Sequence, residues 1–125
     1  SWFGDPRPPR LSLAHQNWLE ENLPGQAPHS LFAVIATADT KGLRGRLGTL
    51  CLTAREAVFF SRKWGRPVIR PLGPVLALEA GNGLLLDELV LVGTGDERQR
   101  FDLLAGQLES ARDEVMRRSP STSAI

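Results

Sequence analysis

The sequence predicts a mainly β fold: seven short antiparallel strands forming a barrel or sandwich, with an N-terminal helix and a capping C-terminal helix. The chain has 125 residues and is 42% hydrophobic, which is enough for one core and too little for two comfortable domains. Between residues 29 and 103, seven short runs rich in Val, Leu, Phe or Thr are bounded by Gly, Pro or charged turns. Their spacing favours antiparallel pairing over an alternating α/β sheet.

Residues 1–10 precede this domain as a Pro-rich arm that we expect to be extended or disordered, because each X-Pro bond disfavours helix in the preceding residue. Ser12 is suited to cap the first helix. That helix should end at Pro24-Gly25, and it buries the face on which four residues follow helical spacing: Leu11, Ala14, Trp18 and Leu19.

The seven strand candidates are "HSLFAVIATA", "RLGTLCLT", "EAVFFS", "RPVIRPL", "PVLALEA", "LLDELVLVG" and "RQRFDL". Runs such as "FAVIA" are apolar on both sides, so we expect one face in the barrel and the other under a helix. Pro67, Pro71 and Pro74 cannot donate ladder hydrogen bonds, which makes the fourth and fifth strands short or places them at an edge.

The segment from Leu104 to Arg118 predicts the C-terminal helix, because apolar residues recur at intervals of four, three and four. Its opposite face carries Asp113–Arg117 and Glu114–Arg118 at i,i+4, which we expect to be solvated. Residues 119–125 should be disordered, so the domain runs over 11–118.

Two stretches carry a family resemblance: "GRLGTLCLTAREAVFFSRKWGRPVIRPL" and the lead-in "WLEENLPGQ". Over roughly residues 13 to 118 the chain resembles the bacterial pleckstrin-homology-like (PH-like, GRAM-like) domains, with Gln26 where that lead-in usually has Glu. The resemblance implies a seven-stranded barrel with one open end plugged by the C-terminal helix. Its pattern is mostly apolar, so it specifies a fold and leaves the activity open.

Composition excludes several classes of function. A net charge of +1 argues against nucleic acid as a partner. No stretch approaches the roughly 20 apolar residues of a membrane span, and no signal peptide opens the chain, so we expect a cytoplasmic protein, with peripheral membrane association as the alternative. A single cysteine, Cys51, fits a reducing compartment.

The residues of catalysis and metal binding do not form a recognisable set, so we expect no cofactor and no metal. Cys51 lies in the middle of a strand and is interpreted as core filler. His15 and His29 lack metal-ligand spacing. Without a catalytic set the sequence favours a non-enzymatic protein, and a small hydrolase using Cys51 is the remaining enzymatic alternative.

The best site candidate is a basic rim. The resemblance implies that the loops after the first, third and sixth strands meet at the mouth opposite the C-terminal helix. Trp64 in the third loop either projects as a tip or folds back over the barrel. The sixth loop would bring Asp96 and Glu97 to the same mouth, where their charges would repel phosphates. The basic rim consists of Lys41, Arg44, Arg46, Arg62, Lys63, Trp64 and Arg66.

The expected function is a non-enzymatic binding module for a protein partner or for self-assembly, with a sheet edge available for strand addition. The alternative is a peripheral binder of anionic lipid headgroups or inositol phosphates through the basic rim and Trp64. In "KGLRGR" the basic pair follows its lysine too closely for the phosphoinositide pattern of the eukaryotic family.

Overall fold

The computed structural model describes residues 9–37, 40, 42–104 and 106–118. Most of the predicted arm, the predicted tail and Lys41 lie outside these residues. In chain order the elements are α1 (Leu13–Asn22), β1 (Ser30–Ala36), β2 (Leu47–Leu52), β3 (Glu56–Lys63), β4 (Arg66–Pro74), β5 (Ala77–Asn82), β6 (Asp87–Val92), a short 3-10 turn η1 (Thr94–Asp96), β7 (Arg98–Leu103) and α2 (Leu108–Arg118).

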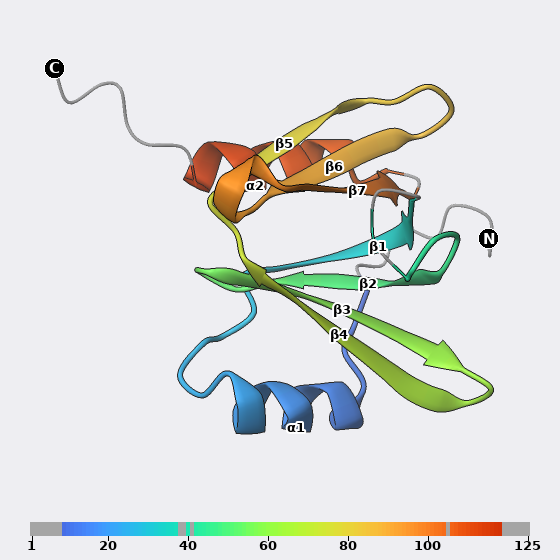
Figure 1. Cartoon of the computed structure of the whole chain (residues 1–125), viewed down its shortest axis with the longest axis vertical. Helices are drawn as coiled ribbons and strands as arrows, with labels where there is room; N and C mark the ends of the chain where they lie inside the picture. The colour runs from blue at the N-terminus through green and yellow to red at the C-terminus, as the bar shows by residue number, and fades with distance from the viewer. Residues whose placement is uncertain (1–8, 38–39, 41, 105, 119–125) are drawn as a thin grey trace, which may run out of the picture.

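The seven strands form one antiparallel sheet in the order β4-β3-β2-β1-β7-β6-β5. The sheet bends where β1 meets β7, so β1–β4 and β5–β7 lie as two layers, with α1 on the outside of the first and α2 beside the second (Figure 1). The predicted mainly β architecture with an N-terminal and a C-terminal helix is confirmed. The sheet is not closed into a barrel: β4 and β5 are its two edges among the described residues.

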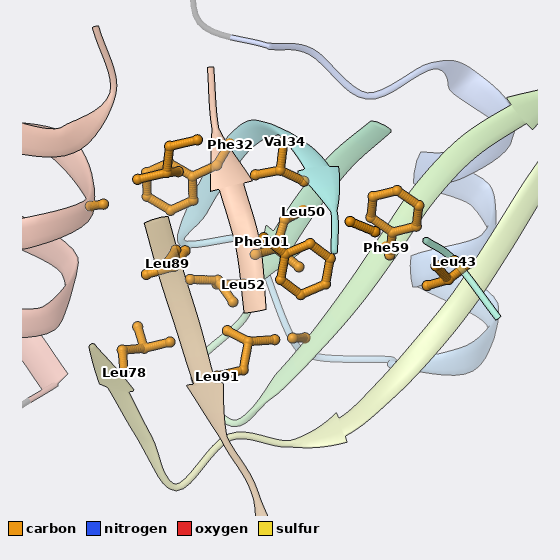
Figure 2. Close-up of a cluster of buried hydrophobic side chains, with 14 residues drawn as sticks. Phe32, Val34, Leu43, Leu50, Leu52, Phe59, Leu78, Leu89, Leu91 and Phe101 are labelled. Atoms are coloured by element: carbon orange, nitrogen blue, oxygen red, sulfur yellow. The ribbon is translucent and has the colours of Figure 1, made fainter. Parts of the chain in front are cut away.

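The main core lies between the two layers (Figure 2). Alternate residues of β1 point into it, Phe32, Val34 and Ala36, as the two-residue period of a strand requires. The rings of Phe59 and Phe101 meet there at a centroid distance of 5.8 Å. This core packs the two layers of the bent sheet against each other.

A second, smaller core lies between α1 and the outer face of β2–β4. Cys51, Val58 and Phe60 point away from the main core and are covered by Leu19 of α1. The ring of His15 stacks on Phe60 at 4.5 Å. A helix therefore covers the outer face of β2–β4, whereas the outer face of the run "FAVIA" in β1, with Ala33 and Ile35, is only half-buried.

The C-terminal helix differs from its prediction in two ways. It begins at Leu108 rather than Leu104, because the backbone N–H of Leu104 donates to Ala33 O at 3.1 Å and so continues the sheet. The side chain of Gln107 bonds both the N–H and the C=O of Ala33, at 2.8 and 2.7 Å, which fixes the turn into the helix.

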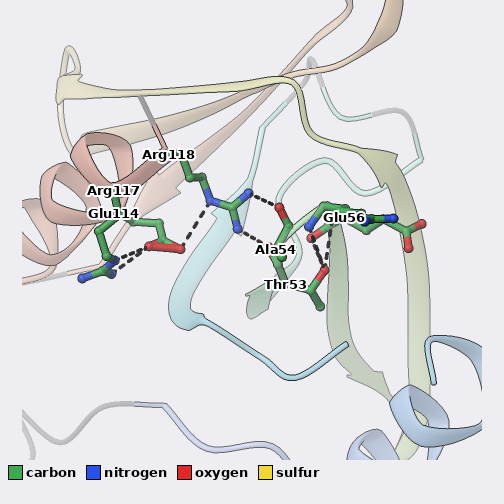
Figure 3. A network of polar contacts seen from close by, with 7 residues as sticks. Thr53, Ala54, Glu56, Glu114, Arg117 and Arg118 are labelled. Carbon is green, nitrogen blue, oxygen red and sulfur yellow. Dashed lines mark hydrogen bonds and ion pairs between the residues drawn. The ribbon is translucent and has the colours of Figure 1, made fainter. Parts of the chain in front are cut away.

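The second difference concerns Glu114, which was expected on a solvated face and is fully buried. Its carboxylate lies 2.7 Å from Arg117 Nη2 and 3.3 Å from Arg118 Nε, so Arg117 pairs with it rather than with its predicted partner Asp113 (Figure 3). Burial alone would raise the pKa of Glu114. Hydrogen bonds from Arg117 and Ser30 and the charges of both arginines outweigh burial and lower that pKa.

Arg118 extends this contact to the turn between β2 and β3. Its guanidinium donates to the carbonyl oxygens of Thr53 and Ala54. Thr53 Oγ1 donates to Gln26 Oε1 at 2.7 Å, and Gln26 Nε2 donates to Glu56 at 2.9 Å. We refer to Gln26, Thr53, Glu56, Glu114 and Arg118 as the polar cluster. It connects α2, and the segment that leads from α1 into β1, to the β2–β3 turn.

Candidate binding surface

The β3–β4 hairpin carries the aromatic of the basic rim at its tip. Trp64 and Gly65 both have left-handed φ values, 54° and 76°, between the paired residues Lys63 and Arg66. This is the geometry of a two-residue hairpin turn. The Trp64 side chain is 92% exposed, so it projects as a tip and the alternative that it folds back over the sheet is wrong.

Strand register divides the cations of this hairpin between two faces. Lys63 and Arg66 are paired across the turn and lie on the face of Phe59, which points into the main core. Arg62 is one residue away and points to the opposite face, that of α1. There its charge adds to the larger effect of burial in lowering the pKa of His15.

The β1–β2 loop lies on the same side of the sheet as Lys63 and Arg66. A Cβ at Gly42 would lie 3.5 Å from the guanidinium of Arg70 on β4, so the loop leans toward that strand. Arg44 is exposed in this loop, and Arg46 is half-buried, its carbonyl accepting from Ala36 N at 3.0 Å. Lys41 belongs to the same loop but falls in the part that the structure does not describe.

Arg70 is a cation near this surface that the sequence analysis did not include. It is exposed and lies four residues after Arg66, on the same face of β4 by the two-residue period of a strand. Counting that period along "RPVIR" would have found it. The structure thus brings Lys63, Arg66 and Arg70 to one face, places the β1–β2 loop that carries Arg44 near Arg70, and separates Arg62 from them.

The loop between β6 and β7 is in a different place from its prediction. Gly93 and Glu97 line a small depression with Pro74 and Val75, at the opposite end of β4 from Arg66. The expectation that Asp96 and Glu97 share a mouth with the β3–β4 turn is therefore wrong. The reason is connectivity. The end of β6 pairs with the start of β5, and β5 begins directly after β4 ends, so the β6–β7 loop lies at that end of β4.

A second exposed tip lies at the β5–β6 hairpin, and two of its residues, Leu85 and Leu86, fall in the predicted strand "LLDELVLVG". Leu84, Leu85 and Leu86 are 99%, 92% and 41% exposed, and we call them the leucine tip. The last ladder pair is Asn82–Asp87, so the leucines form the loop. The Gly-Asn-Gly before them was the signal for that loop.

Both tips project to the same side of the molecule (Figure 1). The leucine tip shares a shallow depression with Thr37, the residue that follows β1. The β1–β2 loop begins there and leans toward β4, and Ser61 Oγ donates to Leu47 O at 2.7 Å to hold the start of β2 beside the end of β3. This end of the molecule therefore carries two apolar tips, with Lys63 and Arg66 beside one and Arg100, paired with Glu88, beside the other.

A groove of about 730 Å³ lies beside α1, where the helix covers β2–β4 and leaves part of β1 uncovered. Its apolar residues include Leu11, Leu19, Leu23, Pro28 and Leu31. The groove was not foreseen from the sequence, since it depends on how the lead-in segment passes from α1 to β1.

Cys51 offers little reactivity in this fold. It is fully buried in the second core, and desolvation raises the pKa of its thiol to about 11. The reactive thiolate is therefore scarce near neutral pH. Among residues 9–37, 40, 42–104 and 106–118, no three His, Cys, Asp or Glu side chains gather as a metal site, and no helix is long and apolar enough to span a membrane.

Comparison with known proteins adds information on the fold alone. No protein-family model matches the chain, and no curated protein matches it in sequence. A crystal structure of the C-terminal domain of an unknown protein from Leishmania infantum is similar, with a TM-score of 0.57 and 12% sequence identity over 82% of this chain and 93% of that one.

Proposed function

We propose that this chain is a non-enzymatic binding module of the PH-like kind, whose working surface is the end bearing Trp64 and the leucine tip. The observation that carries the proposal is the exposure of four large apolar side chains at two hairpin turns on one side of the molecule. Exposed apolar side chains gathered in one region are typical of interaction sites.

The chemistry of the surface favours a protein partner, which includes a second copy of the chain. Trp and Arg are the residues most enriched at the energetic centres of protein interfaces, and Trp64 lies between Lys63 and Arg66. Beside the leucine tip lie the carboxylates of Asp87, Glu88 and Asp102 with one cation, Arg100, which pairs with Glu88, so the surroundings of this tip favour an anionic membrane less than those of Trp64 do. A protein surface can complement both signs at once.

The absence of an enzyme activity is part of this proposal. It is supported by the burial of Cys51 and the raised pKa of its thiol, which oppose the alternative of a small hydrolase. No cofactor is required for the binding that we propose.

Anionic lipid headgroups or inositol phosphates are the second candidate, favoured by Lys63 and Arg66 beside an exposed indole. Such cations bind phosphates by charge-assisted hydrogen bonds, and Trp partitions into the membrane interface. Peripheral membrane association would then occur through the β3–β4 hairpin alone.

Sedimentation velocity over a series of protein concentrations, paired with co-sedimentation on anionic vesicles, tests the two candidates. A protein partner of the same chain predicts a concentration-dependent sedimentation coefficient that Trp64→Ala and Leu85→Ser reduce. Met116→Ala removes an exposed apolar side chain on α2, away from both tips, and serves as the control. Vesicle binding by a strictly monomeric protein would support the second candidate, and neither behaviour at low salt would overturn both self-association and lipid binding.

A further inference from the structure

The groove beside α1 combines an apolar floor with an acidic edge. Its floor includes Leu19 of α1, Leu23 directly after that helix, and Leu31 of β1. Glu20 lines it and Glu21 follows, both exposed, while the last turn of α1 has no basic residue. The C-terminal end of a helix carries partial negative charge, which adds to these two carboxylates.

The β3–β4 tip has the complementary chemistry. Its centre is the exposed indole of Trp64, and the exposed cations Arg62, Lys63 and Arg66 surround it. An aromatic flanked by cations fits an apolar groove with an acidic edge, since the ring is removed from water while opposite charges meet around it.

Within one copy the tip cannot reach the groove. Trp64 lies at a two-residue turn closed by the Lys63–Arg66 pair, so no flexible linker lets it fold back. Arg62 lies near His15 in the first half of α1, whereas the acidic edge lies in its second half. The tip of one molecule therefore has access to the groove of another molecule only.

We propose that Trp64 of one copy inserts into the α1 groove of a second copy, with Lys63 and Arg66 beside Glu20 and Glu21 of that copy. The inference rests on the proposed function and names the partner of the same surface. A groove of about 730 Å³ lies within the roughly 300–1,000 Å³ of typical ligand sites. Arg10 lines the groove near its entry from the N-terminal side and would direct the cations of the tip toward the acidic end.

This contact joins two different surfaces and is therefore heterologous. Such an interface continues head to tail unless the rotation between copies closes a ring. We expect sedimentation to show a series of species that grows with protein concentration, and we expect higher salt to shift the series toward the monomer because part of the attraction is between charges.

Two variants test the two halves of the contact separately. Trp64→Ala removes the indole from a solvent-exposed turn, and Ala27→Arg combined with Glu20→Lys fills and recharges the groove at exposed positions. Each variant alone should sediment as a monomer at concentrations where the wild type associates. Thermal melting is the check that both still fold.

Mixing the two variants gives the decisive measurement. The Trp64→Ala copy keeps an intact groove and the groove variant keeps an intact tip, so an equimolar mixture should form a one-to-one complex that neither forms alone. A mixture that remains monomeric overturns the inference. Met116→Ala in place of Trp64→Ala is the matched control and should associate like the wild type.

The outcomes separate this inference from the proposed function. If Trp64→Ala abolishes association while the groove variant associates normally, the tip is a binding surface and the groove is not its partner. If the wild type is monomeric at all concentrations, the inference fails. In that case, Trp64-dependent co-sedimentation with anionic vesicles would assign the tip to a lipid surface.

Discussion

The two ends of β3 differ in which side chains they bury and which they expose to solvent. At the β2–β3 end, Arg118 of α2 donates to the carbonyls of the turn, and the fully buried Glu114 is paired with Arg117 and Arg118. At the β3–β4 end the turn extends into solvent, and the Trp64 side chain is almost fully exposed. One end buries charge and the other exposes an apolar ring.

This difference identifies which end of β3 serves stability and which is available for binding. Burial of a carboxylate is tolerated only with good partners, and Glu114 has them in Arg117 and Arg118 of its own helix and in Ser30 at the start of β1. An exposed indole at a tight turn contributes little to the fold. We therefore expect substitutions at the β2–β3 end to change stability, and substitutions at the β3–β4 end to change association.

The largest effect is expected from Glu114→Ala. It leaves Arg118, whose side chain is only 14% exposed, beside the carbonyls of Thr53 and Ala54 without its carboxylate. Removing one partner of a buried ion pair should lower the free energy of unfolding by roughly 2–4 kcal/mol, measured by urea denaturation. Asp113→Ala, exposed on the same helix, is the control and should change it by less than about 0.5 kcal/mol. Equal effects of the two variants would contradict the structural role of the polar cluster.

The sequence predicted the elements better than their environments. The seven strands, α1 from its Ser12 cap to Pro24-Gly25, and the burial of Cys51 follow from local periods and turn residues, and all are present. The environment of Glu114 was missed because an i,i+4 pair on a helix looks the same whether solvent or another turn faces it. Only the tertiary position of the β2–β3 turn distinguishes these cases.

The candidate site was predicted in part for the same reason. The turn in "SRKWGRP" was predicted from its residues, whereas the sequence left open whether Trp64 projects or folds back, and the structure shows its side chain exposed. The leucine tip was hidden because three leucines resemble a strand unless the preceding Gly-Asn-Gly is weighted as a turn. The groove beside α1 depends on the path of the segment between helix and sheet, which no local pattern encodes.

A steric prediction concerns Gly48, on β2 between the two ends of the sheet. A Cβ at Gly48 would lie 2.4 Å from Phe60 O and 2.6 Å from Phe59 Cζ, so Gly48→Ala forces the two strands apart. We expect a loss of about 2 kcal/mol in the free energy of unfolding. Gly81→Ala, where a Cβ meets nothing within 4 Å, should be nearly neutral. If Gly48→Ala unfolds at the same urea concentration as the wild type, the packing of β2 on β3 described above is wrong.

A pH effect should appear at the face of β3 that carries α1. His15 is buried, its Nε2 has no hydrogen-bond partner, and burial followed by the charge of Arg62 lowers its pKa below 6.5. The unfolded chain then binds a proton at a higher pH than the folded protein. Stability is therefore complete above about pH 6.5 and falls as the pH drops through the folded pKa.

His15→Phe keeps a ring against Phe60 and removes the titration. We expect the melting temperature of the wild type to fall between about pH 7 and 5, and that of His15→Phe to fall less. An unchanged pH profile in the variant would show that His15 is not the group responsible.

The smallest change in stability, and the one that most sharpens the contrast between the two ends, is expected from Trp64→Asn. Trp64 holds a left-handed φ of 54°, a conformation that is costly for a bulky residue and easy for Asn, and an Asn followed by Gly65 would be a preferred sequence for this turn. The variant should be more stable than the wild type by up to about 1 kcal/mol, as measured by urea denaturation. The same variant should lose concentration-dependent association in the ultracentrifuge. A residue that strains its own turn and exposes its ring fits the proposed binding role better than a role in folding, and a variant that is less stable yet associates normally would contradict that role.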